Sequence, residues 1–321
     1  MRRRELFKAA ALGALAVAAP RIGRAERANK LVFVPTEDLS LLDPHFAGPR
    51  SRRTHAYLVF DTLYGIDTSW AAQPQMVEGH QVEEDGLTWT LTLRDGLRFH
   101  DKEPVLARDV VASIRRFAAR ISFADALMAA TEELSAPDDR TVRFRLKRPF
   151  PHLPEALAGP GGIVPAIMPE RLAKTSPSKP VSEIVGSRPY RFLPDEHITG
   201  ARAAYEHFQL YQPRPDGPAG FTSGPKIVHF GRVEWLTLDL FSASAALRSG
   251  EVDWWEVPLN DQAQALSRNR DITVIPHFAT AMGILRFNHP PFNNVAVRRA
   301  LLGAVDQAEA MTAIAGADRA F

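Results

Sequence analysis

The residue types that most often do chemistry are present in this chain, but none of them forms a known catalytic or metal-binding motif. No serine lies in a Gly-x-Ser-x-Gly turn, and no His-Glu-x-x-His sequence places two zinc ligands on one helix face. The ten histidines are scattered, and His197 and His207 follow glutamates without metal-ligand spacing. Residues 159–162, Gly-Pro-Gly-Gly, precede no Lys-Ser or Lys-Thr pair, so they form no phosphate loop. The sequence therefore predicts no enzyme, no metal site and no cofactor, with an unrecognised hydrolase as the alternative.

The chain contains no cysteine. We therefore expect no disulfide, no thiolate catalysis and no cysteine-ligated metal. A lipid anchor is not expected either, because it would need a cysteine at the cleavage site of an export signal.

Residues 1–25 have the features of an export signal. Arg3–Lys8, with the sequence RRELFK, fits the twin-arginine pattern, and an alanine-rich stretch follows at residues 9–19. That stretch is too short to span a bilayer, which needs about 20 residues. Small residues around Ala25 suit a cleavage site. We therefore expect a twin-arginine signal peptide and a soluble periplasmic protein, with a basic membrane anchor or a fortuitous basic start as the alternatives.

Most of the positive charge lies in this predicted signal. The whole sequence has a formal net charge of +2 at neutral pH, and residues 1–25 hold six basic residues and one acidic residue. The remaining residues therefore carry a formal charge of −3. Because they contain no basic stripe, we expect no binding to nucleic acid.

Strands and helices alternate along the rest of the chain. In residues 87–93 apolar residues alternate with threonines, which predicts a strand with one apolar face. An Asp-Gly turn at 95–96 and apolar residues at helical spacing over 110–117 follow. The other expected strands are 31–34, 142–146, two within 227–238, 252–257 and 282–288. The other expected helices are 54–64, 242–249 with Gly250 as its C-terminal cap, one with Asn294 as its N-terminal cap, and one from Asp306 to Gly316. This order predicts an α/β fold, with residues 212–226 as a solvated surface loop.

Residues 87–117 also resemble the best-known segment of the family 5 extracellular solute-binding proteins, the peptide- and nickel-binding class served by ABC importers. Five further segments resemble that family in the same order, namely 43–63, 186–192, 246–253, 287–292 and 297–306. Each segment alone is a weak match. Six segments in register identify the chain as a member of this family.

Three positions depart from the family pattern. Arg188 stands where the family has a second glycine, so a positive φ at this position would be strained by about 1 kcal/mol. Lys102-Glu103 replaces a Gly-Thr pair, which predicts an altered or strained turn. Leu106 stands where a capping threonine is usual, and its loss costs about 1 kcal/mol of helix stability.

The resemblance implies a class II periplasmic binding protein fold, in which two lobes close on a ligand by a hinge motion. It implies a first-lobe core at 26–64 and 186–278, an inserted subdomain at 65–185 that subdivides this lobe, and the start of the second lobe at 279–321. Strand 282–288 would be the crossing between the lobes. Because the family's members are longer, we expect a truncated second lobe in this chain.

The resemblance also implies a function. The protein would bind peptides or similarly sized solutes as the periplasmic component of an ABC importer. It would present them to a membrane permease, as a monomer and without chemistry of its own. Two alternatives stay open: a nickel or metal-chelate binder of the same family, and a truncated remnant without transport function.

The resemblance and the residue types suggest which side chains face the ligand cleft, where large apolar contact and a few polar groups are needed. The candidates are Trp254, Trp255, His45, Phe46, Arg52, Arg53, Phe123, Gly161 and Asn288. Alternation in a strand cannot bury both tryptophans on one face, so one of them should face the cleft. Core packing, a solvated loop or a plain turn stays the alternative for each candidate.

Overall fold

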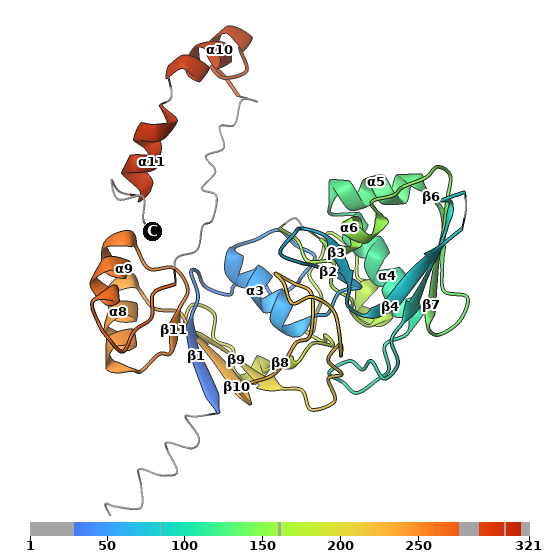
Figure 1. The fold of residues 1–321 in the computed structure, drawn as a ribbon, viewed down its shortest axis with the longest axis horizontal. Coiled ribbons are helices and arrows are strands. Elements are labelled where there is room, and N and C mark those ends of the chain that lie inside the picture. Colours follow the sequence, from blue (N-terminus) through green and yellow to red (C-terminus); the bar gives the residue numbers. More distant parts are fainter. Residues whose placement is uncertain (1–28, 84, 160–161, 276–288, 305, 316–321) are drawn as a thin grey trace, which may run out of the picture. The chain divides into compact units, whose positions relative to one another are not determined.

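The computed structural model describes residues 29–83, 85–159, 162–275, 289–304 and 306–315 (Figure 1). The predicted signal at 1–25 and the expected strand 282–288 lie outside the described residues. The chain divides into two compact units. Unit 1 contains the residues up to Leu238 and Val252–Glu256, and unit 2 contains Asp239–Glu251 and the residues from Val257 onward.

One part of unit 1 is built on a five-stranded sheet. Its strands are β1 (Lys30–Val34), β8 (Tyr190–Phe192), β9 (Arg202–His207), β10 (Arg232–Leu236) and β11 (Trp254–Trp255). They lie in the order β11-β1-β10-β9-β8, and a short 3-10 turn, η1 (Pro194–Glu196), follows β8. β1 runs parallel to both of its neighbours, so the carboxyl ends of β1, β10 and β11 meet at one edge of the sheet.

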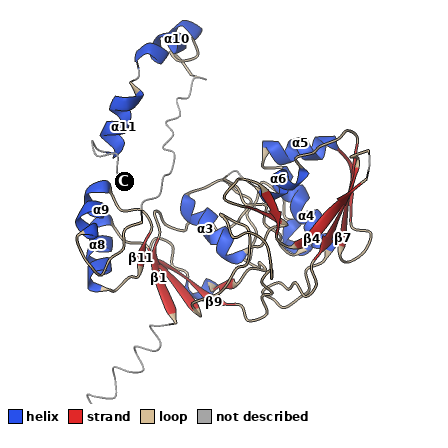
Figure 2. Cartoon of the chain, in the orientation of Figure 1, coloured by secondary structure: helices blue, strands red, loops and turns tan. Residues whose placement is uncertain are grey.

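One face of this sheet carries a row of aromatic rings. Phe33, Trp235 and Tyr205 follow one another across neighbouring strands, with ring centroids 5.3 and 5.2 Å apart. The helix α3 (Arg50–Val59) lies beside the sheet (Figure 2). Nδ1 of its His55 lies 3.0 Å from the Tyr205 hydroxyl oxygen, so the helix packs on this row. The apolar face of the sheet is therefore covered where α3 reaches it.

Unit 1 also contains an antiparallel sheet of four strands in the order β4-β5-β7-β6. Its strands are β4 (Val77–Val82), β5 (Thr88–Leu93), β6 (Thr131–Ser135) and β7 (Thr141–Leu146). On β5 the apolar residues are buried and the threonines are half-exposed, which confirms the alternation read from the sequence. The small hairpin of β2 (Tyr64–Ile66) and β3 (Ala72–Pro74) precedes this sheet.

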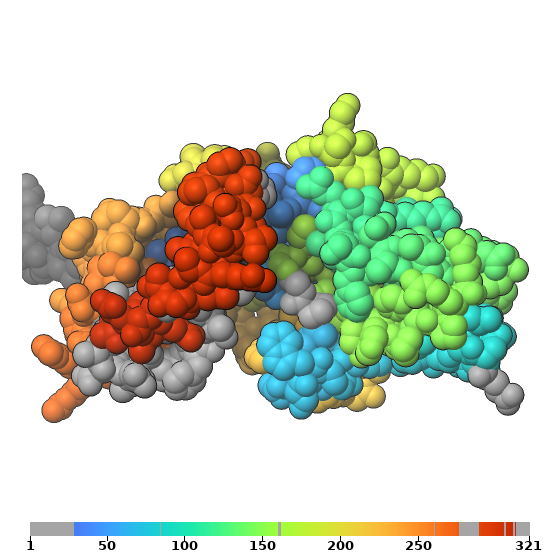
Figure 3. Space-filling view, turned by 90° about the horizontal axis from the view of Figure 1, so that it is seen from above, coloured from blue at the N-terminus to red at the C-terminus, as the bar shows by residue number. Residues whose placement is uncertain are grey.

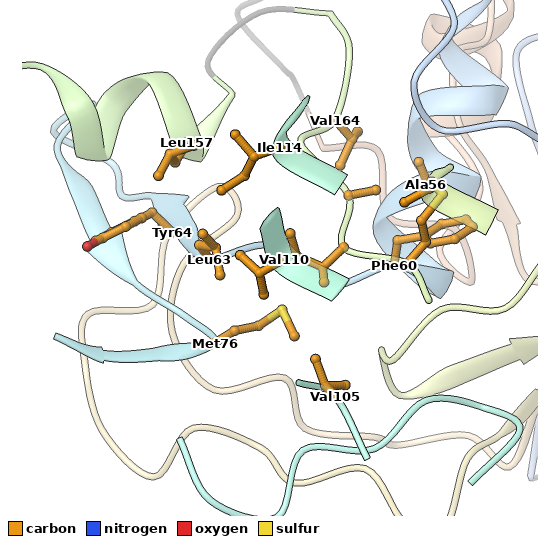
Figure 4. Packing of buried hydrophobic residues seen from close by; sticks show 14 of the residues in the cluster. Ala56, Phe60, Leu63, Tyr64, Met76, Val105, Val110, Ile114, Leu157 and Val164 are labelled. Atoms are coloured by element: carbon orange, nitrogen blue, oxygen red, sulfur yellow. The ribbon is translucent and has the colours of Figure 1, made fainter. Parts of the chain in front are cut away.

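Two helices pack on the four-stranded sheet, α4 (Ala107–Ala118) and α5 (Ser122–Ala130). The short α7 (Glu170–Ala173) packs on α4, and α6 (Leu153–Ala158) packs on α5 and on the hairpin of β2 and β3. Figure 1 shows α4, α5 and α6 on the same side of β4 and β7, and the space-filling view shows this region as a continuous surface (Figure 3). The hydrophobic core of unit 1 contains side chains of α3, α4, α6 and β2, including Ala56, Val110, Leu157 and Tyr64 (Figure 4).

Unit 2 contains four helices among the described residues. They are α8 (Leu240–Ser249), α9 (Asn260–Ser267), α10 (Val295–Ala304) and α11 (Gln307–Ala315). Gly250 ends α8 in the left-handed conformation, with φ 74°, as expected. The side chains of Asn294 and Asp306 accept the backbone N–H groups of Ala296 and Ala308 at 2.8 Å each, which confirms both predicted caps. The predicted stop at Gly316 lies outside the described residues.

Several expected elements have different bounds in the structure. The helix expected at 54–64 is α3, which ends at Val59 because the next residue is already extended. The two strands expected within 227–238 are one strand, β10, and the strand expected at 252–257 is the short β11. The helix expected at 242–249 begins earlier, because Asp239 caps it by accepting the N–H groups of Phe241 and Ser242.

Residues 212–226 form a mostly exposed loop, as expected, and one part of this loop is hydrogen-bonded to β2. Thr222 donates its N–H to the Ile66 carbonyl at 2.9 Å and accepts the Ile66 N–H on its hydroxyl at 2.7 Å. A Cβ at Gly65 would lie 2.3 Å from the Thr222 carbonyl oxygen, so only glycine allows this approach. Such backbone pairing could not be read from a proline- and glycine-rich composition.

The three departures from the family pattern have different outcomes. In the described residues only Trp70 and Lys102 have a positive φ without being glycine, so Arg188 is not strained in this way. Lys102 has φ 75°, which confirms a strained turn. Leu106 stands directly before α4 and offers no capping side chain, although Asp109 accepts the Leu106 N–H at 2.8 Å.

None of the described helices is both long and apolar enough to cross a membrane.

Candidate functional site

Trp254 is the predicted site residue that the structure exposes most clearly. It lies on β11, and strand alternation buries its neighbour Trp255, which is 7% exposed, while Trp254 is 55% exposed. The Trp254 ring stands edge-on to Phe33 of β1, with centroids 5.2 Å apart. It thus extends the aromatic row to the outer strand of the sheet.

Carboxylates gather where β1 and β11 end. Glu256 accepts both the N–H and the hydroxyl of Thr36, at 3.0 and 2.7 Å. Glu37 accepts the N–H of Arg50 at 2.9 Å. Asp38 accepts the N–H of Gly200, also at 2.9 Å. These bonds fix the positions of the three carboxylates at the carboxyl edge of the parallel strands.

We call Trp254, Thr36, Glu37, Asp38 and Glu256 the β11 edge. Ligands of open α/β sheets bind outside the carboxyl ends of the strands, where loops can approach them. An exposed indole offers an apolar face and also attracts cations, and each carboxylate keeps further lone pairs for a donor. This edge can therefore hold an apolar group beside a positively charged or hydrogen-bond-donating group.

His45 and Arg52, two further predicted site residues, are buried and have partners inside unit 1. His45 Nε2 lies 3.0 Å from the Ala166 carbonyl oxygen, and Arg52 Nη1 donates to the Pro44 carbonyl oxygen at 2.8 Å. Burial lowers the pKa of His45 to about 4, so its ring is neutral at pH 7. In this structure the hydrogen bonds of both side chains hold the segment that follows β1 in place.

A buried ion pair that the sequence reasoning missed holds the same segment. Arg116 of α4 donates to both carboxylate oxygens of Asp43, at 3.0 and 2.7 Å, and both side chains are almost fully buried. Asp43 also accepts the N–H groups of His45 and Val181. Burial by itself would raise the pKa of Asp43, but these hydrogen bonds outweigh it and hold that pKa below its ordinary value.

The remaining described candidates lie elsewhere in unit 1. Phe46 is half-buried, with the guanidinium of Arg120 4.4 Å from its ring centroid. Arg53 is half-buried on α3, over the ring of Tyr57. Phe123 is 39% exposed on α5. Its helix contacts the four-stranded sheet, whereas Trp254 lies on the five-stranded sheet.

Two candidates, Gly161 and Asn288, lie outside the described residues. In the part of the chain that the structure describes, no group of three or more His, Cys, Asp or Glu side chains could hold a metal ion. Among the described residues, the β11 edge is therefore the candidate solute-binding site.

Sequence comparison relates most of the chain to one family. Residues 71–320 match the bacterial extracellular solute-binding proteins, family 5 Middle. A protein of Sinorhizobium fredii, named as a probable peptide ABC transporter periplasmic-binding protein, is 36% identical over 99% of this chain. The chain covers 61% of that relative, and about half of the next curated relatives, which are glutathione-binding proteins.

Solved structures give the same fold. A dipeptide-binding protein from Pseudoalteromonas sp. SM9913, in complex with Met-Leu, matches 88% of this chain and 58% of its own, with a TM-score of 0.70 and 19% identity. NikZ from Campylobacter jejuni, in complex with Ni(L-His), matches 89% and 55%, with a TM-score of 0.66 and 18% identity. The expected α/β fold of the two-lobed periplasmic binding proteins is thereby confirmed. The chain belongs to the family 5 extracellular solute-binding proteins of bacteria.

Proposed function

We propose that this chain acts as the periplasmic substrate-binding component of an ABC importer and takes peptides or solutes of similar size. The observation that carries this proposal is the 36% identity, over 99% of the chain, to a relative named for peptide transport. The protein would bind its solute as a monomer, pass it to a membrane permease and do no chemistry on it.

In this proposal the β11 edge contributes part of the solute site. Trp254 would stack on an apolar part of the solute, and Glu256, Glu37 and Asp38 would receive its N–H or ammonium donors. A peptide supplies both kinds of group, since its side chains and backbone N–H groups alternate along the chain. His45, Arg52 and Trp255 would support the edge from within, while Phe46, Arg53, Phe123, Gly161 and Asn288 stay proposed contacts. The proposed lobes keep the boundaries predicted from the sequence.

We also propose that the twin-arginine sequence at Arg3–Lys8 exports the folded protein to the periplasm. Cell fractionation tests this step. The variant with Arg3→Lys and Arg4→Lys keeps the charge but should stay in the cytoplasm, whereas wild type should reach the periplasm. Equal export of both would contradict the proposal.

Two alternatives from the sequence stay distinct from a peptide binder. One is a nickel-chelate binder of the same family, and the other is a remnant that binds no solute. The second has to be tested because this chain covers only 61% of its peptide-transport relative.

A thermal melt of the purified chain distinguishes the peptide binder, the nickel-chelate binder and the remnant. Each melt is run alone, with a mixture of di- to pentapeptides, and with nickel–histidine, since a ligand raises the melting temperature of the state that it binds. A rise with peptides alone supports the proposal, and a rise with nickel–histidine alone supports the chelate binder. A melt that no ligand shifts supports the remnant.

A further inference from the structure

A groove of about 340 Å³ lies between α4 and α7 in unit 1 and shares no residue with the β11 edge. It is lined by Arg108, Val111, Ala112, Arg115, Arg116, Ala136, Glu170, Ala173, Lys174, Thr175 and Pro177. The five residues of α4 in this list recur at helical spacing, so they form one face of that helix. The opposite face of α4 carries Val110, Ile114 and Phe117, which are buried in the core.

The lining combines apolar side chains with cations. Val111, Ala112 and Ala173 are buried or half-buried and provide the apolar part. Arg108 and Arg115 are exposed at the rim. The Arg108 guanidinium forms no hydrogen bond or ion pair with any residue that the structure describes.

The other charged groups of the groove leave it positive. The Arg116 charge is compensated by its buried pair with Asp43. Lys174 pairs with Glu170 at 3.0 Å, but Lys174 is 68% exposed, so this pair is weak. Once these two pairs are set aside, Arg108 and Arg115 remain. Arg115 donates from Nη2 to the Leu134 carbonyl at 2.8 Å, which leaves its charge uncompensated, and Arg108 interacts electrostatically with the Asp109 carboxylate. Two guanidinium groups against one carboxylate leave the groove with a net positive charge. This charge favours an anionic occupant.

Hydrogen bonds hold both walls of the groove in place without a ligand. Asp109 of α4 accepts the N–H of Glu170, the first residue of α7, at 2.7 Å. Arg116 donates from Nε to the Thr175 carbonyl at 3.2 Å and from Nη2 to the Lys179 carbonyl at 2.9 Å. A site that is already formed saves the ordering cost of binding.

We infer that this groove is a second binding site, for a small organic anion that carries a short hydrocarbon chain. The anionic head lies between Arg108 and Arg115, and the chain lies on Val111, Ala112 and Ala173. The volume is at the lower end of the range of small-molecule sites, about 300–1,000 Å³. A protein partner would need about 800 Å² on each side, which a groove of this size does not provide alone. The inference does not rest on the proposed solute at the β11 edge.

Calorimetric titration of the full chain with four probes tests the site. Hexanoate has both the anionic head and the chain, acetate lacks the chain, and hexanol and hexylamine lack the anion. We expect hexanoate to bind at least tenfold more tightly than the other three. Equal binding of hexanoate and hexanol, or of hexanoate and acetate, would overturn the inference.

Variants then locate the site on the groove. Arg108→Gln should weaken hexanoate binding about tenfold, since a charged hydrogen bond is lost. The matched control is Arg143→Gln, which removes an exposed arginine on β7, outside the groove, and should leave hexanoate binding unchanged. Ala112→Glu places a carboxylate among the apolar lining residues and should abolish binding. Equal effects of the variants at 108 and 143 would overturn the inference, as would binding of a polyglutamate peptide without binding of hexanoate.

Discussion

Replacing Asp43 by asparagine should destabilise unit 1 strongly. Asp43 accepts four hydrogen bonds, two from Arg116 and one each from the N–H groups of His45 and Val181. The amide of asparagine can accept on one atom only, and its NH₂ group would face a donor. The Arg116 guanidinium would keep its charge in a site where its side chain is 1% exposed.

The expected magnitude follows from this geometry. Removing one partner of a buried ion pair costs about 3–5 kcal/mol, because the other charge stays buried without compensation. Arg116 also donates to the carbonyls of Thr175 and Lys179, and these two hydrogen bonds reduce the loss of stability. We therefore expect Asp43→Asn to lower the free energy of unfolding by about 3 kcal/mol, a large share of the 5–15 kcal/mol typical of folded proteins.

Urea unfolding, followed by circular dichroism, measures this change. The variant Asp43→Asn with Arg116→Met should lose less stability than the sum of the two single variants, because no charge is left unpaired. Glu132→Gln is the matched control, since its pair with Arg145 has both side chains more than half exposed. It should cost less than about 1 kcal/mol. If Asp43→Asn costs no more than Glu132→Gln, the reasoning about the buried pair is refuted.

Three further predictions concern pH and the two local departures from the family pattern. Burial lowers the pKa values of His45, His55 and His100 to about 4, 3 and 4, so below pH 6.5 the unfolded chain binds protons that the folded chain excludes. Urea unfolding between pH 7 and 4.5 should therefore show stability falling as the pH falls, by up to about 4 kcal/mol per pH unit, and a flat profile would contradict these assignments. Lys102→Gly should be about 1 kcal/mol more stable than Lys102→Ala in urea, because only glycine relieves a positive φ, and equal midpoints would argue against strain. Leu106→Thr should stabilise α4 by about 1 kcal/mol by thermal melting, whereas Leu106→Ala should not.

Sequence reasoning works best where structure is local. The alternation along β5, the helical spacing of α4 and the caps at Gly250, Asn294 and Asp306 depend on residues a few positions apart. Each of these was predicted from residue types and appears in the structure. The family resemblance added the fold, since six segments in order carry more information than periodicity alone.

Contacts between distant segments could not be predicted in this way. Arg116 and Asp43 are 73 positions apart, and nothing in a helical arginine marks its partner. The contact between His45 and Ala166 spans 121 positions, so the burial of this predicted site residue became clear only in the structure. Thr222 pairs with Ile66 over 156 positions. Trp254 and Trp255 show the intermediate case, because alternation predicts that they differ but does not say which ring is exposed.

The measurement that tests the central claim most directly is calorimetric titration with the peptide that gives the largest rise in the thermal melt. Wild type is compared with Trp254→Ala and with Trp70→Ala, which removes a tryptophan that is 65% exposed on the turn between β2 and β3. We predict that wild type and Trp70→Ala bind alike and that Trp254→Ala binds about 30-fold more weakly, as expected for an aromatic anchor worth about 2 kcal/mol. Failure of wild type to bind any peptide, or equal binding by all three chains, would contradict a solute site at the β11 edge.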